Sequence, residues 1–91
     1  MTKDIRHTLK SGKASIGSWL NLGSPLAAEV MAAAGFDWLV VDAEHTSYSM
    51  ENISNMFRAI EARGAIPLAR AWDHSTSTAG RLLDAGAYGI I

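Results

Sequence analysis

The most informative stretch of the chain is Leu39-Val40-Val41-Asp42-Ala43-Glu44-His45, in which a short apolar run leads directly into two carboxylates and an imidazole. Such a run is typical of a buried strand in a parallel sheet, and in α/β folds the chemistry gathers where these strands end. If the strand continues, Asp42 and Glu44 lie on one side and His45 on the other; a turn after Asp42 would bring all three together. We therefore expect this strand to deliver acid/base groups to the rim of a sheet.

Segments of helical and strand character alternate along the whole chain. Ser24-Pro25 indicates an N-cap followed by proline at the first helical position, and Ser49 is a second candidate cap. Four glycines each follow a stretch of helical character and are expected to end a helix, at positions 12, 35, 64 and 86. The pattern predicts helices over 2–10, 25–34, 49–63 and 75–85, and strands over 15–20, 38–41, 66–70 and 87–91.

This alternation predicts an α/β fold with parallel strands, either half of a (β/α)₈ TIM barrel or a small doubly wound sheet. A complete barrel needs about 250 residues, whereas the chain has 91 and stops on an apolar strand. Residues 1–91 are therefore expected to form a partial domain. Half of a barrel would leave strand edges and an apolar inner face uncovered, so it would be prone to pairing.

Composition excludes several classes of function. The net charge is -1, from eight basic and nine acidic residues, which does not favour a nucleic-acid or membrane partner. The chain has no cysteine, so disulfides and thiolate metal sites are impossible. Neither a secretory signal nor an apolar run of about 20 residues is present. We expect a soluble, cytoplasmic protein.

Polar residues follow three successive predicted strands. Because the carboxyl ends of parallel strands meet at one rim, these residues are expected to converge there. The alternative for each is structural: the acids cap loops, the histidine is a surface residue and the arginine pairs with a nearby acid. The residues are Asn21 and Gly23 after the first strand, Asp42, Glu44 and His45 after the second, and Arg70 at the end of the third.

Asp84 and Trp19 are further candidates. Asp84 falls in the last turn of a predicted helix, where the helix dipole disfavours an acid by roughly 0.3–1 kcal/mol. It either pairs with Arg81 or orients a histidine. Trp19 and Trp72 lie near the predicted rim and are candidates for the wall of a pocket.

Four segments of the chain resemble the HpcH/HpaI-type class II aldolases, which are metal-dependent and cleave 4-hydroxy-2-oxoheptanedioate or 2-dehydro-3-deoxyglucarate. The segments are Gly-Ser-Trp-Leu at 17–20, Ala-Gly-Phe-Asp-Trp-Leu-Val-Val-Asp-Ala-Glu-His at 34–45, Pro-Leu-Ala-Arg at 67–70 and Leu-Leu-Asp-Ala-Gly-Ala-Tyr-Gly-Ile-Ile at 82–91. The resemblance implies the N-terminal half of a (β/α)₈ barrel. It also implies a carbon–carbon lyase that works through a metal-stabilised pyruvate enolate.

The resemblance also implies roles for individual residues. His45 paired with Asp84 would move protons, and Arg70 would bind the 2-oxo acid and stabilise its enolate. Asp42 would lie near the substrate hydroxyl, and Glu44 would lie near the metal–water network without binding the metal directly. Trp19 would complete the substrate site.

The implied cofactor is a divalent ion, Mg²⁺ or Mn²⁺, whose ligands are expected in the absent C-terminal half. The implied partners are pyruvate or oxaloacetate, an aldehyde and further copies of the chain. Two features depart from the family pattern: Thr46 replaces a small residue, and the stretch from Arg70 to Trp72 is about one residue short. Two alternatives stay open, a non-catalytic half-barrel assembly unit and a related acyl-CoA or malyl lyase.

Overall fold

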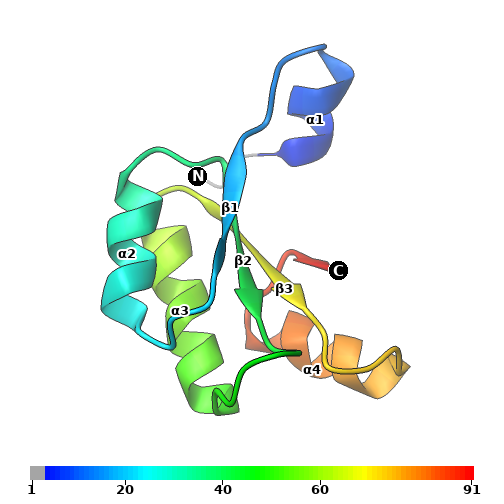
Figure 1. The fold of residues 1–91 in the computed structure, drawn as a ribbon. Coiled ribbons are helices and arrows are strands. Elements are labelled where there is room, and N and C mark those ends of the chain that lie inside the picture. Colours follow the sequence, from blue (N-terminus) through cyan, green and yellow to red (C-terminus); the bar gives the residue numbers. More distant parts are fainter. Residues whose placement is uncertain (1–3) are drawn as a thin grey trace.

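The computed structural model describes residues 4–91, which form one parallel sheet with helices between its strands (Figure 1). The strands are β1 (Gly17–Leu20), β2 (Trp38–Asp42), β3 (Ile66–Arg70) and β4 (Gly89–Ile90). The helices are α1 (Ile5–Lys10), α2 (Pro25–Ala33), α3 (Met50–Ala62) and α4 (Thr76–Ala85). None of these helices has the length and apolar composition needed to cross a membrane.

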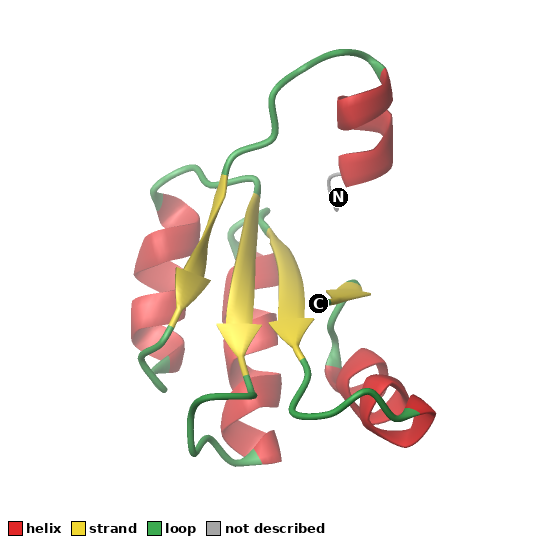
Figure 2. Cartoon of the chain, turned by 45° about the vertical axis from the view of Figure 1, so that its right-hand side comes forward, coloured by secondary structure: helices red, strands yellow, loops and turns green. Residues whose placement is uncertain are grey.

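The strand order distinguishes the two architectures that the sequence left open. Neighbours in the sheet follow chain order, β1-β2-β3-β4, and every pair is parallel. In a doubly wound sheet the strand order would instead reverse at a switch point, so neighbours would not all follow chain order. Figure 2 shows α2 and α3 together on one face of the sheet, as expected when successive crossovers return on the same side. The described residues thus have the winding of a (β/α)₈ barrel.

The two predicted N-caps, Ser24 and Ser49, and the four predicted helix-ending glycines are confirmed, and Ser75 is a further N-cap. Ser24, Ser49 and Ser75 are N-caps, and each side chain accepts a hydrogen bond of 3.1 Å from the backbone N–H three residues later. The four helix-ending glycines, at 12, 35, 64 and 86, have φ values between 81° and 128°. Glycine adopts this region without the steric cost that a side chain brings.

Strand limits differ from the predictions at three places. β1 begins at Gly17 rather than 15, because Ile16 pairs with Asp37 instead: its N–H donates to the Asp37 carboxylate and its carbonyl accepts from the Asp37 N–H. β2 extends one residue further than predicted, through Asp42, and β4 contains only Gly89 and Ile90. The predicted helical residues 2 and 3 lie outside the described part of the chain.

The two faces of the sheet have different roles. One face packs Leu39 and Val41 against the helices, including the buried stripe of α3 formed by Ile53, Met56, Phe57 and Ile60. The opposite face, which we call the inner face, consists of rows set by the strand register. These rows are Gly17-Trp38-Ile66, Trp19-Val40-Leu68-Gly89 and, at the strand ends, Asp42-Arg70. The rim of the inner face thus carries a negatively charged residue, Asp42, and a positively charged residue, Arg70.

Candidate functional site

Asp42 and Arg70 are register partners at the ends of β2 and β3, and they form a two-point ion pair. Arg70 Nε donates to Asp42 Oδ1 at 3.1 Å, and Arg70 Nη2 donates to Asp42 Oδ2 at 2.5 Å. Hydrogen bonding to Arg70 lowers the pKa of Asp42 from 3.8 to about 2, although its burial acts in the opposite direction. The same contact raises the pKa of Arg70. Both groups are therefore charged at neutral pH.

The chain turns immediately after Asp42. Asp42 Oδ1 accepts hydrogen bonds from the backbone N–H groups of Glu44, at 3.0 Å, and His45, at 3.2 Å. Thr46 Oγ1 donates to the Asp42 carbonyl at 2.5 Å. An aspartate that bonds to the backbone two and three residues ahead favours a turn over continued strand. Of the two arrangements left open by the sequence, the turn is therefore the one that forms.

Glu44 lies between the predicted base and the predicted oxo-acid-binding cation. Its Oε1 is 3.3 Å from His45 Nε2 and 3.3 Å from Arg70 Nε. Because His45 Nε2 and Arg70 Nε both contact Glu44 Oε1, the distance between these two nitrogens is at most twice 3.3 Å. The His45 side chain is 68% exposed, so one side of the imidazole is open to solvent. The structure thus brings Asp42, Glu44, His45 and Arg70 to one rim.

Trp19 covers one side of Arg70. The Arg70 Cζ lies 4.8 Å from the centre of the Trp19 ring, within the range of a cation–π contact. Trp19 therefore sits beside the site, where the sequence had suggested a pocket wall. Trp72 instead stacks with Arg81, at 5.7 Å, and forms a separate contact.

Asp84 is not brought to His45. It lies exposed in the last turn of α4, and within residues 4–91 no hydrogen bond or ion pair joins the two side chains. The partner of Arg81 is Trp72 rather than Asp84. The His45–Asp84 dyad that the resemblance implies stays a prediction.

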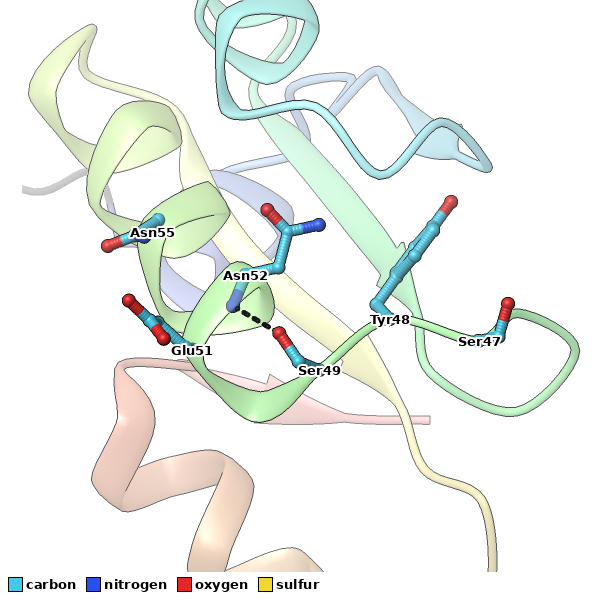
Figure 3. Close-up of a pocket in the computed structure, with 6 residues that line it drawn as sticks. All are labelled: Ser47, Tyr48, Ser49, Glu51, Asn52 and Asn55. Carbon is cyan, nitrogen blue, oxygen red and sulfur yellow. Dashed lines mark hydrogen bonds between the residues drawn. The ribbon is translucent and has the colours of Figure 1, made fainter.

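Sequence reasoning overlooked Tyr48, which joins two loops at the rim. A Cβ on Gly23 would lie 2.6 Å from a Tyr48 ring atom, so the ring packs directly on this glycine. Asn52 Nδ2 donates to the Gly23 carbonyl at 2.8 Å. Figure 3 shows Tyr48 and Asn52 together beside a polar pocket at the start of α3. The only signal in the sequence was a glycine shortly after a predicted strand, which does not identify its neighbour.

The Tyr48 hydroxyl is buried and has no hydrogen-bond partner among the described residues. Burial raises the pKa of this hydroxyl, and the negative charge of Asp42 raises it further. The group is therefore neutral at physiological pH. A buried hydroxyl without a partner destabilises the fold.

The described residues do not build a metal site. Within 4–91, no three His, Cys, Asp or Glu side chains are grouped so that they could hold an ion. The two acids at the rim, Asp42 and Glu44, both contact Arg70. These residues alone therefore do not offer a set of three ligands to a metal ion.

Sequence comparison identifies aldolases as relatives, although no family model matches the chain. The 4-hydroxy-2-oxo-heptane-1,7-dioate aldolase of Shigella sonnei is 34% identical over 91 residues, which are 100% of this chain and 35% of the relative. The hydroxypyruvate/pyruvate aldolase of Agrobacterium fabrum is 39% identical over 83 residues, 91% of this chain and 31% of the relative. The chain thus spans about a third of the length of these relatives.

Solved structures show the same relationship. The citrate synthase SbnG superposes with a TM-score of 0.85 at 34% identity, over 94% of this chain and 35% of that one. An HpcH/HpaI aldolase from Desulfitobacterium hafniense superposes with a TM-score of 0.83 at 32% identity, over 94% and 34%. By sequence and by fold, the chain is similar to the HpcH/HpaI aldolases, of whose length it spans about a third.

Proposed function

We propose that this chain supplies the proton-transfer and oxo-acid-binding part of a carbon–carbon lyase, an aldolase that cleaves or forms 4-hydroxy-2-oxo acids. The observation that carries the proposal is that Glu44 contacts both Arg70 and His45 at one rim of the sheet. A cation held by an ion pair, close to an exposed imidazole, suits enolate chemistry. The imidazole accepts a proton, and the cation stabilises the oxygen that becomes negative.

In the proposed reaction, His45 removes a proton from the methyl group of pyruvate. The electron pair of that C–H bond moves toward the carbonyl, and the resulting enolate oxygen is negative. Arg70, fixed by Asp42, stabilises this charge without having to reorient. In the addition direction, the enolate carbon attacks the aldehyde carbon, the C=O π bond breaks, and the former aldehyde oxygen takes the proton that His45 holds. In the cleavage direction, His45 removes the proton of the 4-hydroxyl, the C–C bond breaks to release the aldehyde, and the enolate carbon takes that proton from His45.

Other parts of the proposal come from the resemblance alone. Asp84 would orient His45, and Glu44 would lie close to a metal–water network. A divalent ion, Mg²⁺ or Mn²⁺, would supply Lewis-acid chemistry, with ligands expected outside this chain. The homo-oligomeric state and the cytoplasmic location expected from the sequence also remain proposals.

The names of the relatives support a 2-oxo acid as substrate. One acts on 4-hydroxy-2-oxo-heptane-1,7-dioate, and the other on hydroxypyruvate and pyruvate. All of these carry a carboxylate next to a carbonyl, and such a group suits a guanidinium. We propose pyruvate or oxaloacetate, together with an aldehyde, as the substrates here.

Deuterium exchange at the pyruvate methyl group tests this function. The chain is incubated with pyruvate in D₂O, with Mg²⁺ or Mn²⁺ and without either, and the methyl proton signal is followed by NMR. His45→Ala should abolish exchange, whereas His74→Ala, which changes an exposed loop histidine, should leave it unchanged. Exchange at the wild-type rate in His45→Ala would refute the assignment of the base.

Two other functions are each supported by one observation. Among the described strands, β1 and β4 each pair on one side only, which supports a half-barrel that assembles with other copies. A folded monomer in sedimentation would contradict that function. The similarity to SbnG, which is named a citrate synthase, supports the acyl-CoA or malyl lyase alternative. Proton exchange at acetyl-CoA rather than pyruvate would favour it.

A further inference from the structure

Both oxygens of the Asp42 carboxylate accept hydrogen bonds from within the protein. A carboxylate offers about four acceptor sites on its two oxygens. Oδ1 accepts from Arg70 Nε, from the Glu44 N–H and from the His45 N–H, and Oδ2 accepts from Arg70 Nη2. Oδ2 accepts only one hydrogen bond, but 1% of the residue is exposed, so Asp42 offers no open surface to a substrate hydroxyl.

Arg70, by contrast, keeps part of its donor set. A guanidinium has five N–H groups, and Asp42 occupies the Nε–H and one N–H of Nη2. Trp19 covers one face of the group. The outer edge, formed by Nη1 and the second N–H of Nη2, still has the parallel spacing that matches a carboxylate. The side chain is 30% exposed, so a ligand can reach this edge.

From this geometry we infer that Asp42 is a positioning residue, and that a 2-oxo acid binds to the outer edge of Arg70 without touching Asp42. This differs from the substrate contact that family resemblance implies for Asp42. The second half of the inference rests on the proposed function. The first half does not, because it concerns only contacts within the chain.

The positioning role has two targets. The Asp42 carboxylate accepts hydrogen bonds from the Arg70 side chain and from the backbone of the turn that carries His45. Movement of Asp42 would therefore displace the cation and the base together. The short bond from Thr46 to the Asp42 carbonyl closes the turn from its other end.

NMR of the ¹⁵N-labelled chain tests the first half without a ligand. The Arg70 Nε–H signal, assigned by its loss in Arg70→Lys, should lie outside the random-coil position, and Asp42→Asn should return it there. Glu51→Gln, which neutralises an exposed acid in the first turn of α3, should leave the signal unchanged. An Arg70 signal at the random-coil position in the wild type, or one unaffected by Asp42→Asn in a folded chain, would overturn the positioning role.

A measurement on the wild type decides the same point if Asp42→Asn fails to fold. The Arg70 signal should keep its position from pH 7 down to pH 4, since a carboxylate hydrogen-bonded in this way titrates well below that range. A shift to the random-coil position before pH 4 would contradict the positioning role.

Addition of pyruvate tests the second half. In the wild type, pyruvate should shift the Arg70 Nη signals and leave the Nε–H signal in place. Asp42→Asn should raise the Kd for pyruvate at least tenfold. Loss of the Nε–H signal on binding, or an unchanged Kd in Asp42→Asn, would overturn the inference. If wild-type chain does not bind pyruvate at all, the proposed function fails, while the ligand-free experiment still decides the role of Asp42.

Discussion

Asp42→Asn should reduce stability in a pH-dependent way. The folded pKa of Asp42 is about 2, below its ordinary value of 3.8. A lowered pKa contributes stability above the ordinary value, and this contribution is lost as the pH falls through the folded value. At about 1.4 kcal/mol per pKa unit, the contribution at neutral pH is about 2 kcal/mol, and most of it is gone by about pH 2.

Urea unfolding followed by circular dichroism measures this effect. The free energy of unfolding should be about 2–3 kcal/mol lower in Asp42→Asn than in the wild type at about pH 7, since the variant also leaves Arg70 without its buried partner. The difference should shrink by about 2 kcal/mol between pH 6 and pH 2. Glu51→Gln provides the matched control, with a difference of less than about 0.5 kcal/mol at every pH. A stability difference that stays constant across this pH range would refute the reasoning.

Three further substitutions test the packing by urea unfolding. Gly17→Ala should cost about 1–3 kcal/mol, because the new Cβ would lie 1.9 Å from a Trp38 ring atom; Gly80→Ala, in an open helical position, should instead gain about 0.5–1 kcal/mol. A gain in stability for Gly17→Ala, like that expected for Gly80→Ala, would mean that the indole moves aside. Tyr48→Phe should stabilise the chain by about 1 kcal/mol, because it removes a buried hydroxyl without a partner in the described residues; a loss of stability would reveal a partner for that hydroxyl. Ser49→Ala should cost about 1 kcal/mol through loss of the α3 cap, with Ser49→Thr as the variant that retains it.

Most of the fold could be predicted because its signals are local. A serine cap and a terminating glycine depend on a few neighbouring residues, and the boundaries of α3 and β3 followed from such signals with the apolar pattern. The choice between a barrel and a doubly wound sheet could not be made from the chain alone. It depends on which side each crossover takes, and periodicity does not encode that.

The site was predictable in its location but not in its contacts. Placing Asp42, Glu44, His45 and Arg70 at strand ends is sufficient to gather them, since parallel strands end at one rim. The register between β2 and β3 and the turn after Asp42 decide how Asp42 and Glu44 contact the Arg70 guanidinium. These are tertiary features, which the local sequence does not specify. The role of Tyr48 was missed for the same reason, because its contact with Gly23 joins different loops.

The register pairing of Asp42 with Arg70 has a consequence for protein engineering. Two positions 28 residues apart in the sequence behave as one unit, so the effects of changing them will not add. A library that randomises either position alone would sample mostly losses, because each variant leaves a buried or partly buried charge behind. Randomising both together would let an uncharged, well-packed pair appear. Such a pair would show whether the scaffold can keep its shape after Arg70, the cation of the proposed function, has been removed.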